Sequence, residues 1–378
     1  MKDILIAAKN LKIGGIEKSL INLINYLKYN GYNITVVLEE RKGSLLKEIR
    51  KDVNIIIFKP SSLKFIPLRK TINLIKKIRF IIKYKNKFDA AISYATYSKP
   101  GAFVARTASK NSILWCHADY LELNKGNTQK TKDFFEEIYF DDFSKIVFVS
   151  KSAKESFHQI FPEYKKIYYC NNFVNSTKIF ESSKEKTRIK YNQEVITFLN
   201  VSRHDESQKK LSRIIKAAAL LKRENYKFRI IFVGDGKDTA KYKYLAEKLN
   251  VTHNIIFEGS KDNPYPYFKV SDCTILSSDY EGYPVVFLES LLFNKPIITT
   301  DVSDYKEIQD GKGIVTSKST KGIYKAMKEF LDNGYRIEKK FNARKHNLEV
   351  EKQLKKILKN SWNFLWFKLE YIRYKILD

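Results

Sequence analysis

Short apolar runs alternate with amphipathic stretches along most of this 378-residue chain, and this alternation constrains the fold more than any other feature. Such runs, when helical patterns separate them, are typical of parallel strands buried on both faces. In the first half they occupy residues 4–8, 34–38, 55–58, 90–93, 113–115, 146–149 and 166–170. Helical patterns at 18–29 and 150–161 lie between them, as βαβ units require. The first half is therefore predicted to form a doubly wound α/β domain.

The same pattern begins again after a polar, lysine-rich segment. Its apolar runs occupy residues 195–201, 229–233, 255–257, 273–276 and 296–299. The chain exceeds the roughly 150 residues of a common domain, so two domains are expected. We predict an N-terminal Rossmann-like domain at 1–175, a linker at 176–192, a C-terminal Rossmann-like domain at 193–345 and C-terminal helices at 346–378. The aromatic end of these helices, at 362–377, can pack on its own domain or back across the first.

The net charge is +28, from 70 basic and 42 acidic residues. A charge of this size attracts nucleic acid, anionic lipid or a phosphorylated substrate. No helix-turn-helix, zinc-finger or RNA-binding aromatic motif occurs, so nucleic acid is not an expected partner. The segment 61–88 holds nine Lys and Arg residues, no acidic residue, and interleaved Ile, Leu and Phe. It is predicted either to bind an anionic membrane surface, or to cover its own sheet and leave the lysines in water.

The N-terminus and the cysteines bear on localisation. The apolar run at 4–8 is too short for the core of a signal peptide, and no run reaches the roughly 20 residues that span a bilayer. We therefore expect a cytoplasmic protein, with the basic segment offering attachment to the inner face of the plasma membrane. Cys116, Cys170 and Cys273 lie far apart in apolar segments, as reduced core thiols do.

The segment 278–289, SDYEGYPVVFLE, places two glutamates where a predicted strand ends and a helix begins. Gly282 suits the turn, and Pro284 suits a first helical position. In open α/β sheets the ligand lies beyond the carboxyl ends of the strands, where free N–H groups at a helix start attract phosphate. Glu281 is therefore expected to line a ligand cleft from a loop. Glu289 would reach the same cleft from the helix and accept hydrogen bonds from paired hydroxyls.

Arg203 and Lys209 follow the first strand of the second half, and two cations at this place suit a diphosphate. Arginine donates two parallel hydrogen bonds to phosphate oxygens, and lysine supplies a point charge. Lys210 competes with Lys209 for this role. No Asp-x-Asp sequence occurs, so a leaving diphosphate would be stabilised by these cations and by helix dipoles. We expect no metal and no cofactor besides the substrate.

Taken together, these motifs resemble the retaining family 4 glycosyltransferases, whose GT-B architecture has two facing Rossmann-like domains with a cleft between them. The resemblance covers most of the chain, and it implies that the domain at 1–175 binds the acceptor and the domain at 193–345 binds the donor. It is carried by Gly14-Gly15-Ile16-Glu17, Trp115-Cys116-His117, Arg203 with Lys209, Gly234-Asp235-Gly236, Asn263-Pro264-Tyr265-Pro266-Tyr267 and the Glu281 to Glu289 segment.

The resemblance implies a role for each motif in binding a nucleotide-sugar donor. Arg203 and Lys209 would bind the diphosphate, Glu289 the ribose hydroxyls and Glu281 the transferred sugar. His117 would face the sugar and the acceptor, although a lone histidine is more often structural. Backbone that cradles or closes over the donor is expected at Gly14, Gly15, Gly282, Tyr283, Pro284, Val285 and Val286. The sequence departs from the family where Lys210 replaces a common glycine and where His204 and Asp205 replace an apolar start of the loop.

The resulting hypothesis is a retaining, metal-independent glycosyltransferase. It would move a hexose or N-acetylhexosamine from a nucleotide diphosphate sugar, by default a UDP-sugar, to a glycan or lipid-linked acceptor in cell-surface polysaccharide synthesis, such as that of capsule or lipopolysaccharide. Retention is implied by the resemblance, and a double displacement would need a carboxylate nucleophile, for which Glu281 is the candidate. The alternatives are a nucleotide-sugar epimerase of similar shape, and a basic membrane- or nucleic-acid-binding protein without catalysis.

Overall fold

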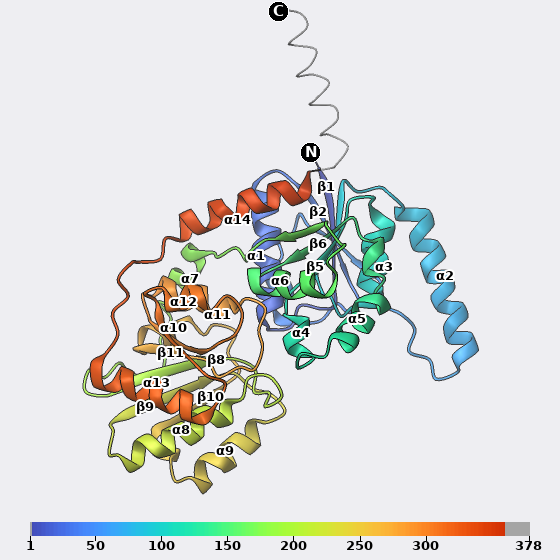
Figure 1. Ribbon diagram of the computed structural model, residues 1–378. Helices are drawn as coiled ribbons and strands as arrows, with labels where there is room; N and C mark the ends of the chain where they lie inside the picture. The colour runs from blue at the N-terminus through green and yellow to red at the C-terminus, as the bar shows by residue number, and fades with distance from the viewer. Residues whose placement is uncertain (1, 360–378) are drawn as a thin grey trace, which may run out of the picture.

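Two parallel β-sheets, each flanked by helices, form the computed structural model (Figure 1), which describes residues 2–359. The aromatic stretch expected to form a helix at 362–377 lies outside the described residues. The two sheets confirm the predicted fold class. Every strand pairs in parallel with its neighbours, and the first sheet has the order β3-β2-β1-β4-β5-β6-β7. Its strands are β1 (Asp3–Ala8), β2 (Asn33–Leu38), β3 (Asn54–Ile57), β4 (Ala90–Ser93), β5 (Ser112–Cys116), β6 (Lys145–Phe148) and β7 (Ile167–Tyr169).

The first domain places helices on both faces of its sheet. In α1, for example, Leu20, Leu23, Ile24 and Leu27 are buried, and this spacing is that of one helix face. The helices are α1 (Gly15–Tyr29), η1 (Ser44–Glu48), α2 (Ile66–Tyr84), α3 (Lys99–Ala108), α4 (Tyr120–Leu123), α5 (Thr128–Glu137), η2 (Phe140–Asp142) and α6 (Lys151–Ile160). A short helix, α7 (Ser176–Ser182), occupies part of the segment expected to be a linker.

The second sheet has the order β10-β9-β8-β11-β12-β13. Its strands are β8 (Ile196–Val201), β9 (Phe228–Val233), β10 (Ile255–Gly259), β11 (Cys273–Ile275), β12 (Ile297–Thr300) and β13 (Gly313–Thr316). The sequence interpretation missed β13, because this edge strand is only half-buried and lacks a clear apolar run. The helices are α8 (Leu211–Arg223), α9 (Thr239–Lys248), η3 (Thr252–Asn254), α10 (Tyr265–Lys269), α11 (Val285–Leu292), α12 (Lys306–Gln309) and α13 (Thr320–Asn333).

The last described helix, α14 (Ala343–Leu358), returns to the first domain (Figure 1). The backbone N–H of Asn171 donates to Gln353 Oε1 at 3.2 Å. Lys145 Nζ donates to the carbonyls of Ile357 at 2.5 Å and Lys359 at 2.7 Å, which caps the C-terminal end of the helix. The chain therefore crosses between the domains twice, once through α7 and once before α14.

The cysteines and the helices of the described residues bear on two simpler features of the chain. Cys116, Cys170 and Cys273 are free and buried, which confirms that they are core thiols. Between residues 2 and 359, no helix combines the length and the apolar character that crossing a bilayer demands.

Candidate active site

The loops that carry the predicted site residues lie where the strand order of each sheet reverses. In the first sheet the reversal lies between β1 and β4, and Gly14 and Gly15 follow β1. In the second it lies between β8 and β11, and the loops with Arg203 and Glu281 follow these two strands. Ligands of open α/β sheets bind outside the carboxyl ends of the strands at such points. The topology therefore brings the candidate residues of each domain to one edge.

Lys209 and Glu281 form a direct ion pair in the second domain. Their side chains are 16% and 8% exposed, so the pair is largely shielded from water. Ser278 Oγ also donates to Glu281 Oε1, at 2.7 Å. The main chain next to Glu281 contacts the first domain, because the N–H of Asp119 donates to the carbonyl oxygen of Glu281 at 3.3 Å. A partly buried lysine and a buried carboxylate thus lie together at the face between the domains.

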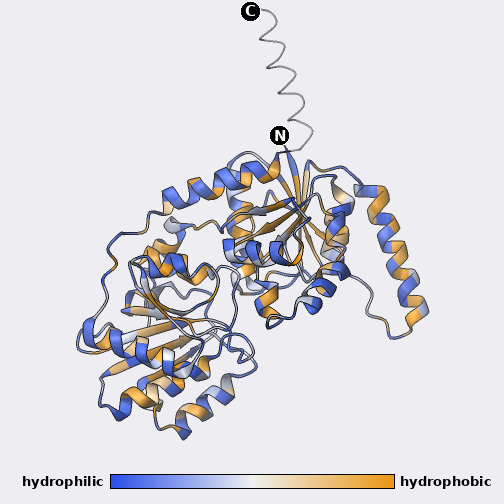
Figure 2. Cartoon of the chain, in the orientation of Figure 1, coloured by the Kyte–Doolittle hydropathy of each residue, from blue (hydrophilic) through white to orange (hydrophobic). Residues whose placement is uncertain are grey.

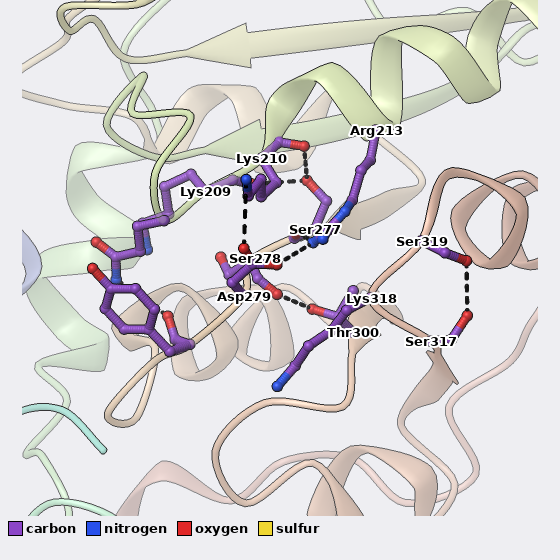
Figure 3. A network of polar contacts seen from close by, with 12 residues as sticks. Lys209, Lys210, Arg213, Ser277, Ser278, Asp279, Thr300, Ser317, Lys318 and Ser319 are labelled. Carbon is purple, nitrogen blue, oxygen red and sulfur yellow. Dashed lines mark hydrogen bonds and ion pairs between the residues drawn. The ribbon is translucent and has the colours of Figure 1, made fainter. Parts of the chain in front are cut away.

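Lys210 is directed elsewhere, which separates it from Lys209. Its Nζ lies 3.6 Å from Asp279 Oδ2, and Arg213 Nη1 lies 2.6 Å from Asp279 Oδ1. Figure 3 shows this group, in which Ser277 Oγ donates to the carbonyl oxygens of Lys209 and Lys210 at 2.9 Å each. The network holds the turn in place, and of the two lysines only Lys209 contacts Glu281.

Glu289 is 3% exposed and faces the first domain from α11. Lys18 Nζ of α1 lies 3.7 Å from Glu289 Oε1 and 5.0 Å from the centre of the Tyr265 ring. Burial, followed by the negative charge of Glu289, raises the pKa of Tyr265 well above its ordinary value. Sequence reasoning missed Lys18, although it directly follows the Gly14 to Glu17 motif.

Arg203 has an exposed guanidinium group that contacts neither Glu281 nor Glu289 in the described structure. Its Nη2 donates to Gln208 Oε1 at 3.1 Å and lies 3.7 Å from Asp205 Oδ2. Its positive charge nevertheless acts on the carboxylate of Glu17 in the first domain. Burial raises the pKa of Glu17, while a backbone hydrogen bond and the positive charge of Arg203 oppose the rise. Arg203 therefore lies at the interdomain face with its donors largely in water.

Two glycines lie where the domains meet. A Cβ atom on Gly282 would lie 2.5 Å from the carbonyl carbon of His117 and 3.1 Å from the backbone nitrogen of Ala118. A Cβ atom on Gly15 would lie 3.9 Å from Val285 Cγ2, which is an ordinary contact. Only Gly282 is therefore required by the contact between domains itself.

The segment from Gly282 to Val286 surrounds the start of α11. Pro284 is the N-cap residue of α11 rather than its first helical residue, and Val285 begins the helix. Tyr283 and Val286 are buried, and the hydroxyl of Tyr283 donates to Glu307 Oε2 at 3.3 Å. This hydrogen bond ties the start of α11 to α12 of the same domain.

His117 directly follows β5, and its ring is tilted by 55° against that of Tyr94, with ring centres 4.4 Å apart. Burial lowers its pKa to about 3, so the ring is neutral near pH 7. Its Nε2 atom is buried and has no hydrogen-bond partner among the described residues. The side chain therefore keeps one ring nitrogen that no described residue contacts by a hydrogen bond.

The departures from the family pattern have structural explanations. Lys210 has φ 51° and ψ 42°, the left-handed conformation that glycine adopts most easily, so the family's glycine suits this backbone better. His204 is fully buried between Phe232, Tyr242 and Phe257, and its Nδ1 is 2.8 Å from Thr239 Oγ1. The buried His204 ring therefore takes the place of the apolar residue that begins this loop in the family pattern.

Polar contacts outside the predicted residues also join the domains. Both carboxylate oxygens of Asp304 accept from α6, at 2.9 Å from the N–H groups of Lys151 and Ser152. Lys318 Nζ donates to Glu122 Oε1 at 2.9 Å. Within residues 2–359, no three His, Cys, Asp or Glu side chains gather as a metal site would require. Metal independence stays a prediction.

Two family models match adjoining regions of the chain. The model of glycosyltransferase family 4 matches residues 13–178, and that of the group 1 glycosyl transferases matches residues 180–348. This protein belongs to the family 4 glycosyltransferases of GT-B fold. The boundary between the two matched regions falls at α7.

Individual relatives agree with this membership. An uncharacterized glycosyltransferase of Methanocaldococcus jannaschii is 27% identical over 194 residues, 50% of this chain and 48% of the relative. The lipopolysaccharide glucosyltransferase WaaG of Escherichia coli is 28% identical over 146 residues, 39% of this chain and 37% of the relative. The matched region thus spans about half or less of these relatives. The structure of HepE from Anabaena, in complex with UDP and glucose, has a TM-score of 0.71 at 14% identity and covers 94% of this chain and 100% of HepE.

Proposed function

We propose that this protein is a retaining, metal-independent hexosyltransferase that uses a UDP-sugar. It would transfer glucose, a related hexose or N-acetylhexosamine to a glycan or lipid-linked acceptor of the cell surface. The observation that carries the proposal is the ion pair between Lys209 and Glu281, which follows the carboxyl ends of β8 and β11 and lies where the main chain of Glu281 contacts Asp119 of the first domain. The UDP and glucose in HepE and the lipopolysaccharide acceptor in the name of WaaG support the choice of donor and acceptor class.

Lys209 and Arg203 would bind and stabilise the leaving diphosphate. A lysine ammonium group has three donors, and Glu281 uses one of them, so two remain for phosphate oxygens. The exposed guanidinium of Arg203 can donate in parallel to the same diphosphate. Both groups carry fixed positive charge where negative charge develops, which is the arrangement that lowers the barrier of a departing diphosphate.

The two glutamates would bind the two ends of the donor. Glu289 is held by the ammonium of Lys18, which the ribose hydroxyls would replace as hydrogen-bond donors when a nucleotide enters. Glu281 already accepts from Ser278 and Lys209, which fixes its carboxylate for hydroxyls of the transferred sugar. The unpartnered Nε2 of His117 would bind the sugar or the acceptor hydroxyl from the first domain.

The test begins with the donor. Nucleotides and nucleotide sugars of uracil, guanine and adenine are screened for a rise in melting temperature, and UDP-sugars should give the largest rise. The best donor is then used to measure release of UDP, and NMR of the product reports whether the anomeric configuration is retained.

Variants then test the assigned roles. The double variant Arg203→Ala/Lys209→Ala should lose about 100-fold or more in UDP affinity, since each charged hydrogen bond contributes about 1.5–3 kcal/mol. Lys328→Ala removes a cation of the same domain that pairs with Glu224 at the C-terminal end of α8, and this variant should bind UDP normally. Glu281→Gln should bind UDP and fold normally but lose at least about 100-fold in turnover. Full activity of Glu281→Gln, or unchanged UDP affinity of the double variant, would refute these roles.

A further inference from the structure

Helix α2 turns its apolar side chains toward solvent. Leu74, Ile75, Ile78 and Ile82 are 57%, 43%, 46% and 76% exposed, while Phe80 is the only buried residue of this helix. Figure 1 shows α2 at the outer edge of the first domain, beside α3, and Figure 2 shows hydrophobic residues along its length. A helix that covers its own sheet would bury these residues. The expectation that the segment 61–88 covers its own sheet is therefore wrong.

Phe80 and two lysines fix this orientation. The Phe80 ring packs in an aromatic cluster, with centres 5.2 Å from Phe58 and 6.1 Å from Phe103. Lys76 Nζ donates to the carbonyl of Lys59 at 2.8 Å, and Lys77 Nζ lies 5.3 Å from the centre of the Phe103 ring. Residues turn by 100° each around a helix, so Ile78 lies nearly opposite Phe80. The side with Lys76 and Lys77 therefore contacts the domain, and the isoleucine side, beside which Arg79 lies, faces away.

The apolar surface continues into the segment that leads to the helix. Leu63, Phe65, Ile66 and Leu68 are between 44% and 66% exposed. With the exposed residues of α2 they form what we call the α2 surface, residues 63–82. The segment follows the carboxyl end of β3, and loops after parallel strands share one edge of the sheet. The near end of the α2 surface thus lies on the same edge as Gly14, Gly15 and His117.

The positive charge of the segment 61–88 indicates which kind of partner can cover the α2 surface. Nine Lys and Arg residues and no acidic residue lie within 61–88, and the whole chain carries +28. A second copy of the chain would bring two such cationic surfaces together and be repelled. A bilayer with anionic lipids accepts apolar side chains at the level of the headgroups and attracts the lysines around them.

We propose that the α2 surface docks on an anionic lipid bilayer. Leu74, Ile75, Ile78 and Ile82 enter the boundary between headgroups and acyl chains, and the flanking cations bind lipid phosphates. Docking does not depend on transferase activity. If the proposed function holds as well, docking brings the carboxyl edge of the first sheet near the membrane, where the sugar acceptor is a lipid-linked glycan.

Site-specific labelling tests the docking. The three native cysteines are buried, so an environment-sensitive dye reacts selectively with a cysteine introduced at Ile82. The full chain carrying Ile82→Cys is mixed with vesicles of phosphatidylcholine that contain about one third phosphatidylglycerol. The dye emission should shift to the blue with these vesicles and much less with pure phosphatidylcholine. Tyr244→Cys on α9, which is 65% exposed, is the matched control and should not respond.

Flotation with the same vesicles gives the second measurement. Leu74→Asn/Ile78→Asn should reduce the bound fraction at least about tenfold, since it removes apolar side chains from the docking face. Each of Arg79→Gln and Lys83→Gln should reduce binding about fivefold. Because these side chains are exposed, circular dichroism should remain unchanged. Glu281→Gln should float like the unaltered protein, which separates docking from catalysis.

Two outcomes would overturn the proposal. The first is a dye at residue 82 that does not respond to anionic vesicles. The second is a blue shift that occurs without lipid and grows with protein concentration, which would assign the surface to self-association.

Discussion

Gly282→Ala is predicted to damage the interdomain site even when no donor is bound. The new Cβ would lie 2.5 Å from the carbonyl carbon of His117, whereas carbon atoms in contact lie about 3.5 Å apart. The two loops must therefore separate by about 1 Å. A displacement of this size at reacting groups costs about 100-fold in rate, and overpacking of this kind costs about 1–3 kcal/mol in stability.

Gly15→Ala is the matched comparison on the other side of the same interface. Its Cβ would lie 3.9 Å from Val285 Cγ2, so the free protein accommodates it, and alanine suits a helix start better than glycine does. If Gly15 closes over the donor as the family resemblance implies, this variant should retain its stability and lose donor affinity.

The assay combines urea unfolding, UDP titration and UDP release from the donor. Gly282→Ala should be less stable and at least about 100-fold slower, while Gly15→Ala should show only weaker donor binding. The reasoning about close approach is refuted if Gly282→Ala unfolds at the same urea concentration and turns over at the normal rate.

Three further predictions concern protonation, backbone strain and metal. Burial lowers the pKa of His117 to about 3 and also lowers those of His204 and His346, whereas an unfolded histidine titrates near pH 6.5. The free energy of unfolding should therefore be highest above pH 6.5 and fall as the pH drops toward 3. The shifted pKa of His117 alone should lower it by about 1.4 kcal/mol at pH 5.5. Urea unfolding at pH 7.5 and 5.5 checks this. The loss of stability between the two pH values should be smaller in His117→Asn than in the unaltered protein, and an equal loss in both would contradict the prediction. Lys210→Gly should be about 1 kcal/mol more stable than Lys210→Ala, because only glycine relieves the left-handed backbone. Equal unfolding midpoints would show that the turn carries no such strain. Activity should survive excess chelator, and a loss that divalent ions restore would disprove a metal-free reaction.

The sequence alone predicted the class of the fold, which the two sheets confirm, and it supplied site residues whose roles stay predictions. Apolar runs fixed twelve of the strands, because a strand buried on both faces needs apolar residues along its whole length. Glu281, Glu289, Arg203 and Lys209 could be selected because the carboxyl ends of parallel strands bind ligands in this fold. Local pattern sufficed for these features.

Only the tertiary structure decided what each face contacts. The periodicity of α2 indicated an apolar stripe, but the aromatic cluster around Phe80 turns that stripe outward. The pairing of Lys18 with Glu289, the return of α14 to the first domain and the left-handed backbone of Lys210 depend on contacts between distant segments. A sequence pattern shows which residues share a face, whereas the partner of that face is set by packing across the whole chain.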